Sequence, residues 1–308
     1  MDEKGVNQLA WGYARDVVSG KVPACSFVVK QCQKAIERLE TFNRGEGHYT
    51  YKPKEAARPA LFAYHACKHL KGPLAGQHIE LEPWQLFMIA QIYGWMRPDG
   101  YRVVRTVYFE VPRKNGKSTI CSVLGLYHLF ADKEASAEVY SAAKTRDQAK
   151  IVFGDAQAMV RSSPKLRSKL GVHRSNIHHT QTNSKFEPLA SDADSLEGKN
   201  PSFSIVDEVH THPSPEVWDV LAIAQGARSQ PIQFGITTSG TNREGIAYQL
   251  RDYLIKTIEG QVDDDTFWGQ VYTLDEGDEW DSVESFAKAN PNYGKSVQPD
   301  DMVRLAKQ

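Results

Sequence analysis

The sequence predicts an α/β fold in which a mainly parallel sheet is flanked by helices. Three observations support this prediction. Apolar, β-branched runs that are typical of strands alternate with longer segments of helical period. A basic turn that contains glycine, within residues 111–119, links one of these strands to a helix. A second short apolar strand, at residues 203–206, ends in the acidic pair Asp207-Glu208.

Composition limits the possible classes of protein. The 308 residues suffice for one large domain or two modest ones, and 41% hydrophobic with 24% charged residues is ordinary for a soluble globular protein. The formal net charge of −1 excludes a global basic field, so any contact with DNA needs local basic patches. We find no signal peptide and no apolar run that approaches a membrane span. We therefore expect an intracellular protein with four reduced, mostly buried thiols, at Cys25, Cys32, Cys67 and Cys121.

The part of the chain before the basic turn is predicted to be helical. Residues 7–19 and 24–42 have helical periodicity, and a glycine and a proline interrupt the chain between them. A short extended piece at 48–51 leads to a third helix over about 54–70. We expect residues 1–76 to form an N-terminal helical extension that packs on the core domain.

A further helix, over residues 86–95, has Pro83 in its first turn. Trp84 and Gln85 lie at its start and allow two interpretations. In the first, Gln85 hydrogen-bonds the adenine edge of a nucleotide while an aromatic or apolar neighbour packs on the base. In the second, the pair is a helix start with a tryptophan in the core. These two residues alone leave both interpretations open.

The basic turn has the context of a phosphate-binding loop, because it follows the β-branched run 102–111 and precedes an apolar helix at 120–130. Its backbone N–H groups and the helix N-terminus direct partial positive charge at a polyphosphate. Lys117 would reach the β and γ phosphates, and the Ser118 hydroxyl would hold Mg²⁺. Val111 stands where the usual pattern has glycine, so a basic surface turn is the alternative. Residues 111–119 are called the phosphate loop below, and its predicted ATP-binding residues are Pro112, Arg113, Lys114, Asn115, Gly116, Lys117, Ser118 and Thr119.

Strand-like and helical segments alternate after the phosphate loop. Strands are expected over 137–143 and 230–236, and a hairpin at the edge of the sheet is expected over 176–189. Helices are expected over 147–161 and 215–227. The other elements are a polar loop at 191–200, a strand at 267–272 and a helix at 300–307.

The acidic pair at the end of strand 203–206 matches the second motif of a nucleotide site. Asp207 would bind Mg²⁺ through water, and Glu208 would orient or deprotonate the attacking water. Two solvated acids at a strand end are the ordinary alternative, but this pair follows a phosphate loop in the chain. Together the two motifs predict a P-loop NTPase fold of the ASCE (RecA-like) type. We place its ATPase core at residues 77–241 and a small C-terminal lid at 242–308.

Hydroxyl residues stand at the end of strand 230–236, at Thr237, Thr238 and Ser239. Beside a γ-phosphate these side chains would sense whether that phosphate is present and pass the difference to the residues that follow. Ordinary turn chemistry is the alternative for such a sequence. The two nucleotide motifs favour the sensing role.

Other polar clusters give weaker indications. The histidines between residues 173 and 212 share no ligand spacing with the cysteines, so no metal site is predicted from them. His210 and His212 follow Glu208 closely and could touch the active site, but solvated loop histidines are the favoured interpretation. Residues 161–174 include six basic side chains, counting His173, and no acid. This stretch is a candidate contact for DNA or for the portal, although a solvated helix face is the favoured interpretation.

In their order along the chain, these motifs resemble those of the large terminase subunits of tailed phages. The resemblance covers nearly the whole chain and implies an ATP-driven motor that threads double-stranded DNA through a portal into a procapsid. Members typically carry a second, nuclease domain of RNase-H-like fold, and no stretch here supplies its triad of acids, so we expect the ATPase part alone, without nuclease activity. The segments that carry the resemblance are Trp11-Gly-Tyr-Ala14, Val18-Ser-Gly-Lys21, Leu81-Glu-Pro-Trp-Gln85, Val111-Pro-Arg-Lys-Asn-Gly-Lys-Ser-Thr119, Ile205-Val-Asp-Glu208, Thr237-Thr-Ser-Gly240 and Asn290-Pro-Asn-Tyr-Gly294.

The resemblance also implies roles for single residues. Some members carry an arginine finger, supplied by a neighbouring subunit, in an Arg-Gly pair before the second motif, where this chain has Glu197-Gly198. The candidates for the finger here are Arg146, Arg228 and Arg243, and the sequence does not choose among them. The implied roles are adenine recognition for Gln85, phosphate sensing for Arg113, phosphate and magnesium binding for Lys117 and Ser118, magnesium binding and base catalysis for Asp207 and Glu208, and coupling for Thr237, Thr238 and Ser239.

The partners implied by the resemblance are ATP, Mg²⁺, double-stranded DNA, the portal protein and the small terminase subunit. Like subunits would assemble into a ring, pentameric during packaging, in the host cell cytoplasm and away from any membrane; the isolated protein is compatible with a monomer. Two rival functions are a different P-loop ATPase, such as a helicase, and a nucleotide-switched assembly protein without sustained turnover. A helicase would need a second motor core that is not visible in the chain, and Glu208 beside Asp207 argues for hydrolysis.

Overall fold

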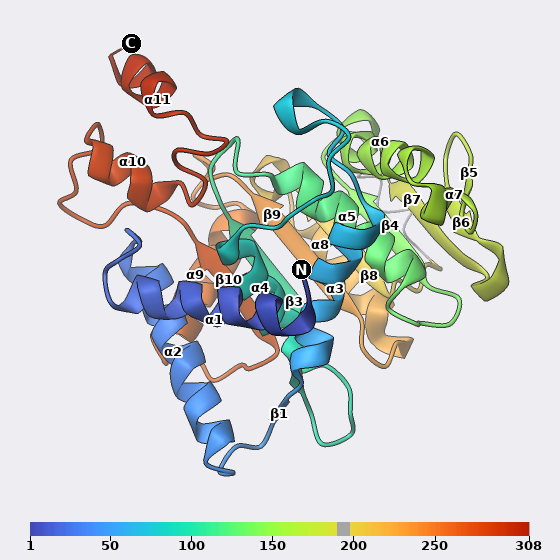
Figure 1. The fold of residues 1–308 in the computed structure, drawn as a ribbon, viewed down its shortest axis with the longest axis horizontal. Coiled ribbons are helices and arrows are strands. Elements are labelled where there is room, and N and C mark those ends of the chain that lie inside the picture. Colours follow the sequence, from blue (N-terminus) through green and yellow to red (C-terminus); the bar gives the residue numbers. More distant parts are fainter. Residues whose placement is uncertain (190–197, 308) are drawn as a thin grey trace.

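The computed structural model describes residues 1–189 and 198–307, in which helices cover both faces of a twisted sheet (Figure 1). The strands are β1 Thr50–Tyr51, β2 Trp95–Met96, β3 Thr106–Glu110, β4 Glu138–Ala142, β5 Gly171–Val172, β6 Ile177–His179, β7 Ser184–Leu189, β8 Phe203–Asp207, β9 Ile232–Thr237 and β10 Phe267–Val271. The α-helices are α1 Glu3–Val18, α2 Ser26–Asn43, α3 Pro53–Ala66, α4 Pro83–Gly94, α5 Lys117–Phe130, α6 Arg146–Ser162, α7 Pro164–Arg167, α8 Glu216–Ala224, α9 Ile246–Ile258, α10 Val283–Ala289 and α11 Pro299–Ala306. Short 3-10 helices are η1 Gly72–Leu74, η2 Thr180–Thr182, η4 Val209–Thr211 and η5 Gln225–Ala227.

The main sheet has the strand order β10-β3-β9-β8-β4-β7-β6-β5. Strands β10 to β7 of this order run parallel, whereas β6 and β5 are antiparallel to their neighbours. The mainly parallel sheet and the edge hairpin that the sequence predicts are therefore confirmed. Since β9 lies between β3 and β8, the carboxyl ends of three strands that carry predicted motifs are neighbours.

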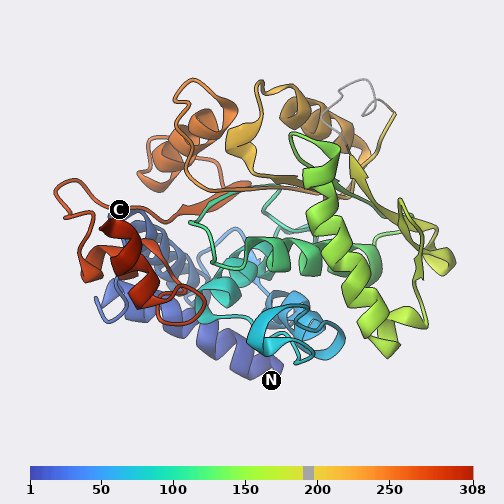
Figure 2. The ribbon, with the colours of Figure 1, turned by 90° about the horizontal axis from the view of Figure 1, so that it is seen from above.

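Side chains of the parallel strands alternate between two separate hydrophobic cores. Val107 and Phe109 of β3 pack in the larger core, with α1 to α6, while Tyr108 between them packs in the second core, with α8 and α9. Figure 2 shows α9 (orange) on one side of the sheet and α1 to α5 (blue to green) on the other. Burial on both faces explains why these strands read as continuous apolar runs.

Helices α1 and α3 pack against α4, whose residues from Trp84 to Gly94 are all buried, and α2 packs against α1. Their apolar side chains belong to the same core as those of β3 and α5, so the extension and the sheet bury one continuous set of residues. The prediction that the third helix reaches residue 70 is wrong: α3 ends at Ala66, because Lys68 pairs with His78 in an extended bridge. None of the helices in the described ranges is long and apolar enough to cross a membrane.

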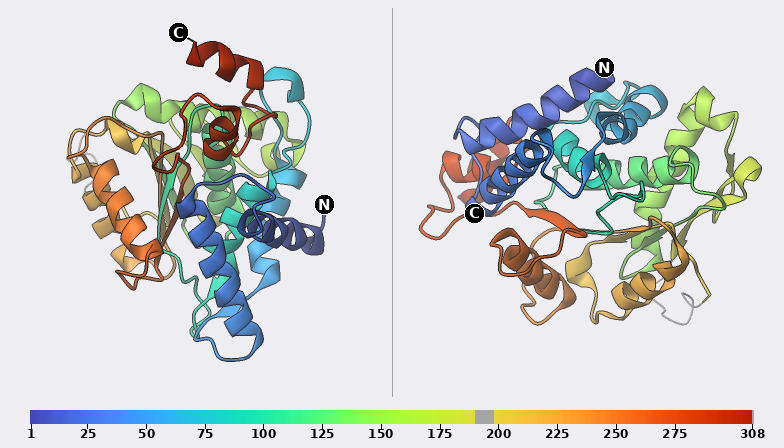
Figure 3. Two further views of the ribbon diagram at one scale, coloured as in Figure 1. Left: turned by 90° about the vertical axis from the view of Figure 1, so that its left-hand side faces the viewer. Right: turned by 90° about the horizontal axis from the view of Figure 1, so that it is seen from below.

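The last parallel strand comes from the region predicted to be a lid. Strand β10 pairs with β3 along its whole length, and α9 packs against both strands. Residues 242–271 therefore belong to the sheet and its covering layer, and only the chain after Val271 lies outside it. In Figures 1 and 3, α10 and α11 (red) lie beyond the end of the sheet, above the N-terminal helices.

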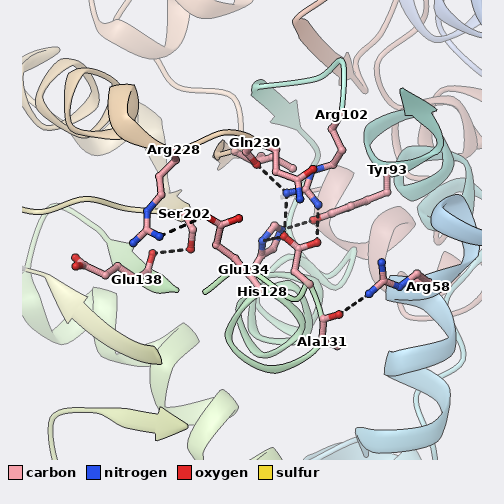
Figure 4. Close-up of polar contacts among 12 residues, drawn as sticks. Arg58, Tyr93, Arg102, His128, Ala131, Glu134, Glu138, Ser202, Arg228 and Gln230 are labelled. Atoms are coloured by element: carbon pink, nitrogen blue, oxygen red, sulfur yellow. Dashed lines mark hydrogen bonds and ion pairs between the residues drawn. The ribbon is translucent and has the colours of Figure 1, made fainter. Parts of the chain in front are cut away.

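A buried polar cluster lies between the sheet and α5, toward the amino ends of the strands (Figure 4). Arg102 forms two hydrogen bonds to the carboxylate of Asp132, at 2.5 and 2.9 Å, and both side chains are at most 5% exposed. His128 bonds the hydroxyl of Tyr93 at 2.8 Å and lies 3.2 Å from Asp132. The guanidinium of Arg102 holds the pKa of Asp132 below its usual range despite burial.

The four cysteines are free and buried, as expected.

Candidate nucleotide site

The phosphate loop joins the end of β3 to the start of α5. Its turn requires a left-handed backbone at Gly116, where φ is +79°, and also at Lys114, where φ is +66°. The N–H of Val111 donates to the Thr237 carbonyl at 3.0 Å, which extends the sheet ladder into the loop. The loop therefore follows the central strands directly, and its last turn delivers the N-terminus of α5.

Lys117, the first residue of α5, lies beside both predicted acids. Its ammonium is within 3.4 Å of the Val111 carbonyl inside the loop. Burial lowers the pKa of Lys117, while the carboxylates of Glu208 and Asp207 oppose that shift. The two sequence motifs, which stand far apart in the chain, therefore lie close together in the structure.

Asp207 ends β8 and is only 8% exposed. The pKa of Asp207 is raised to about 6, chiefly by burial and also by the neighbouring Glu208 charge. A hydrogen bond from the Glu208 N–H and the charge of Lys117 act in the opposite direction. That hydrogen bond, to Asp207 Oδ1, is 2.9 Å long. A buried carboxylate whose charge is this poorly compensated favours a cation nearby. Ser118, which would share that cation, lies half-buried in the first turn of α5.

Glu208 turns back toward the end of β9 because its backbone is left-handed, with φ 48° and ψ 52°. This conformation is costly for a non-glycine residue and is most often found at functional sites. The 3-10 helix η4 then begins, and both the N–H and the hydroxyl of Thr211 donate to the Glu208 carbonyl at 2.8 Å. As a result, Glu208 Oε2 lies 3.4 Å from the Thr238 N–H and 3.5 Å from its hydroxyl.

The predicted coupling residues differ in their surroundings. Thr237 is buried and Thr238 half-buried at the end of β9, whereas Ser239 is exposed. The register places Thr237 opposite Glu110 of β3, and Ile236 opposite Asp207. Thr237 therefore lies between the start of the phosphate loop and the acidic pair.

His210 is a site residue that the sequence analysis assigned to solvent. Its Nδ1 lies 2.8 Å from Thr237 Oγ1 and 3.3 Å from Glu208 Oε2, and its N–H donates to Thr237 Oγ1 at 3.1 Å. His212 is also buried, at 4% exposure, so the expectation of two solvated histidines is wrong. The tight turn of η4 folds this segment back under β9. No local pattern in the sequence marks this contact, because Thr237 lies on the neighbouring strand β9 and not on the strand that His210 follows.

The residues at the start of α4 lie next to the phosphate loop. Gln85 Oε1 accepts the Glu82 N–H at 3.0 Å as part of a capping box, and a Cβ added at Gly116 would lie 3.3 Å from Gln85 Nε2. Trp84 is 3% exposed, and its ring stacks on Phe109 with 5.7 Å between the ring centroids. Its indole N–H donates to Asn292 Oδ1. Its ring therefore serves as a core side chain. Adenine recognition by Gln85 stays a prediction.

The candidate arginine fingers occupy very different positions. Arg228 donates to Asn200, Ala135 and Ser136 carbonyls and pairs with Glu134, all near the amino ends of the strands (Figure 4). Arg228 is therefore bonded at the amino ends of the strands, whereas the phosphate loop lies at their carboxyl ends. Arg243 is exposed just after the coupling residues. The side chain of Arg146, which begins α6, and the residue Glu197 lie outside the described part of the chain.

Two other basic residues of the phosphate loop, Arg113 and Lys114, are exposed. Arg113 is close enough to Lys117 that its charge lowers the pKa of Lys117 further. Pro112 and Thr119 are half-buried, whereas Asn115 is fully buried. The loop thus presents Arg113 and Lys114 outward and keeps the Asn115 amide inside.

The chain is similar to several known proteins. The family model for the terminase large subunit, ATPase domain, matches residues 83–256. The large terminase subunit of Enterobacteria phage HK97 is 27% identical over 254 residues, which are 81% of this chain and 48% of that protein. The crystal structure of the HK97 large terminase superimposes with a TM-score of 0.71 at 25% identity, over 82% of this chain and 51% of that one.

Two further relatives are more limited in extent or identity. Protein YmfN of Escherichia coli K12 is 41% identical over 101 residues, 33% of this chain and 22% of that protein. The terminase large subunit of Lactococcus phage p2 is 23% identical over 70% of this chain and 41% of its own length. The chain thus spans about half or less of the curated relatives that it matches. Because the family model covers more than half of the chain, the chain belongs to the family of terminase large subunit ATPase domains.

Proposed function

We propose that this chain hydrolyses ATP to move double-stranded DNA into a viral procapsid. The family is one of ATPase domains, so nucleotide binding at the phosphate loop is the coarser part of this function. The observation that supports the finer part is the meeting of Lys117, Asp207 and Glu208 at one edge of the sheet, with Thr237 between the strands that carry them.

Magnesium suits the oxygen ligands at this edge. Mg²⁺ binds hard oxygen ligands and keeps several waters, and the buried carboxylate of Asp207 together with the Ser118 hydroxyl would hold it. The raised pKa of Asp207 supports the fit, because a cation would compensate its buried charge. When bound, the metal would neutralise charge on the β- and γ-phosphate oxygens.

The residues of the chain would then divide the work of hydrolysis. Lys117 and the N–H groups of the phosphate loop hold the phosphates. Arg113 senses the phosphates, and Gln85 recognises the adenine. Glu208 accepts a proton from a water whose oxygen attacks the γ-phosphorus, and the bond from that phosphorus to the bridging oxygen breaks, leaving ADP and phosphate. The N–H and hydroxyl of Thr238 hold the Glu208 carboxylate in place.

Coupling to DNA would pass through the end of β9. Thr237, Thr238 and Ser239 would transmit the loss of the γ-phosphate to the chain that follows, in a ring of subunits on the portal. The small terminase subunit would be a further partner, in the host cell cytoplasm. The six basic residues between 161 and 174 are all exposed, which suits contacts with DNA phosphates that do not depend on base sequence.

Replacing Glu208 with glutamine tests the proposal. Glu208→Gln keeps the shape but not the basicity of the side chain, so MgATP binding should persist while kcat falls about 10²- to 10⁴-fold. Glu216→Gln, on the exposed start of α8, is the matched control. ATP binding is measured by calorimetry and turnover over a range of protein concentrations, with Lys117→Ala as the background. Full turnover in Glu208→Gln would show that the base is assigned wrongly.

A further inference from the structure

The sequence Asn290-Pro-Asn-Tyr-Gly294 carries part of the family resemblance, yet no role is assigned to it. In the structure, residues 290–296 form a tight turn after α10, which we call the C-terminal turn. Tyr293 N–H donates to the Asn290 carbonyl at 2.8 Å, and Gly294, with φ +77°, reverses the chain. This turn packs on the phosphate loop, about 175 residues earlier in the sequence.

The contact is made by the one fully buried side chain amide of the phosphate loop. Asn115 Nδ2 donates to the carbonyls of Pro112 and Arg113, both at 3.2 Å, and to Asn290 Oδ1 at 3.1 Å. Asn115 Oδ1 accepts the N–H of Asn292 at 3.0 Å. Both ends of this amide therefore have partners, and the same group that shapes the loop from within also holds the C-terminal turn.

The C-terminal turn is attached to two other parts of the nucleotide site. Asn292 Oδ1 accepts the indole N–H of Trp84 at 2.6 Å, next to Gln85 at the start of α4. Ser296 Oγ donates to the Lys114 carbonyl at 2.5 Å. Lys295 forms an ion pair with Glu82, the cap of α4.

Burial makes these bonds hard to exchange. Asn290 and Asn292 are 5% and 7% exposed, and Asn115 is 0% exposed. Buried amides that lose their partners are costly, so a shift of the phosphate loop away from the turn would strand several polar groups at once. The loop and the C-terminal turn are expected to move together or not at all.

We propose that the C-terminal turn is a positioning element of the nucleotide site, which holds the phosphate loop in the shape that receives a polyphosphate. The proposal rests on the proposed nucleotide function. It assigns Asn290, Asn292 and Ser296 as positioning residues, since none of them is required to touch the reacting atoms. It also joins the chain beyond the turn, including α11, to the occupancy of the site.

The test measures MgATP binding by calorimetry and steady-state turnover for the full 308-residue chain. Asn290→Ala should weaken MgATP binding and raise KM about tenfold, while kcat at saturation changes less than twofold. The substitution removes the hydrogen bond that joins the phosphate loop to the C-terminal turn, together with the bond from Asn290 Nδ2 to the Phe286 carbonyl. Ser282→Ala is the matched control, because the Ser282 hydroxyl caps α10 by accepting the Ser285 N–H, a bond within its own helix. This control should bind MgATP as the wild type does.

Two further measurements distinguish positioning from general stability. Asn115→Ala combined with Asn290→Ala should weaken binding by less than the sum of the two single variants, because both remove the bond between Asn115 and Asn290. MgATP should slow amide hydrogen exchange in residues 290–297 of the wild type, and less in Asn290→Ala. Should Asn290→Ala fail to fold, the exposed Ser296→Ala serves instead, with a smaller rise in KM.

The results separate the inference from the proposed function. A wild-type chain that binds no MgATP overturns both. If the wild type binds MgATP but Asn290→Ala and Ser296→Ala have the same KM and hydrogen exchange as the wild type, the positioning role is wrong. The proposed nucleotide site is then unaffected. An equal loss of MgATP binding in Ser282→Ala and Asn290→Ala also overturns the positioning role, since general loosening of the C-terminal segment would then explain the effect.

Discussion

Replacing His210 with alanine should slow ATP hydrolysis without preventing ATP binding. The imidazole connects the proposed base, Glu208, to the coupling residue Thr237 through its Nδ1, at 3.3 and 2.8 Å. Alanine retains the main-chain N–H that also donates to Thr237 Oγ1, so only the interactions of the ring are removed. Gly240 packs against the His210 side chain, where a Cβ would approach to 2.7 Å, so the ring position is also defined sterically.

The magnitude follows from these two contacts. The single Nδ1–H is shared between both contacts, so they count as one bond; a neutral hydrogen bond contributes about 1 kcal/mol and one to a charged group about 1.5–3 kcal/mol. The His210 side chain is 23% exposed, so water replaces part of both, and we expect a loss near 2 kcal/mol. If that loss falls on the transition state, kcat drops about 30-fold.

Steady-state turnover with saturating MgATP measures this effect. His210→Asn is the informative companion, because the asparagine amide nitrogen occupies the place of Nδ1 and should restore most of kcat. The exposed His173 supplies the control, as His173→Ala. A kcat for His210→Ala within about threefold of the wild type would refute the reasoning.

Two further predictions concern stability. Burial raises the pKa of Asp207 to about 6, above the value of about 3.9 in an unfolded chain, so the native state binds more protons between these values and the free energy of unfolding falls as pH rises through them. The free energy of unfolding of Asp207→Asn, measured by urea denaturation in EDTA, should therefore exceed that of the wild type by at most about 3 kcal/mol at pH 7.5. At pH 4 the two free energies should differ little; equal differences at both pH values would contradict this. Asp132→Asn leaves Arg102 buried without its charge partner and should cost about 3–5 kcal/mol, whereas Asp99→Asn, at an exposed ion pair, should cost under about 1 kcal/mol; similar losses in the two variants would argue against it.

Local patterns were enough to predict most of the helices and strands, and also the basic phosphate loop and the acidic pair Asp207-Glu208. The strand before Val111 and the helix after Gly116 are each marked by their own residues, and so is the apolar strand that ends at Asp207. The parallel sheet follows from the alternation of such elements. None of these inferences needs knowledge of which strands are neighbours.

The features that were missed depend on that knowledge. His210 reaches Thr237 only because β9 lies beside β8, and Asn115 meets Asn290 only because the chain returns to the phosphate loop after β10. Trp84 illustrates the same limit, since its position in the core depends on Phe109 and on a residue near the C-terminus. Long-range contacts of this kind leave no periodic trace in the sequence.

Strand β10 has a consequence for dividing the chain into parts. A cut at residue 241, after the last nucleotide motif, would remove β10 and leave β3 as an unpaired edge with its main-chain groups open along residues 106–110. Val107 and Phe109 on this strand are fully buried, so the new edge would be apolar as well as unpaired. Such edges recruit strands from other molecules. A protein shortened in this way is expected to aggregate, and the smallest well-behaved ATPase unit must include β10.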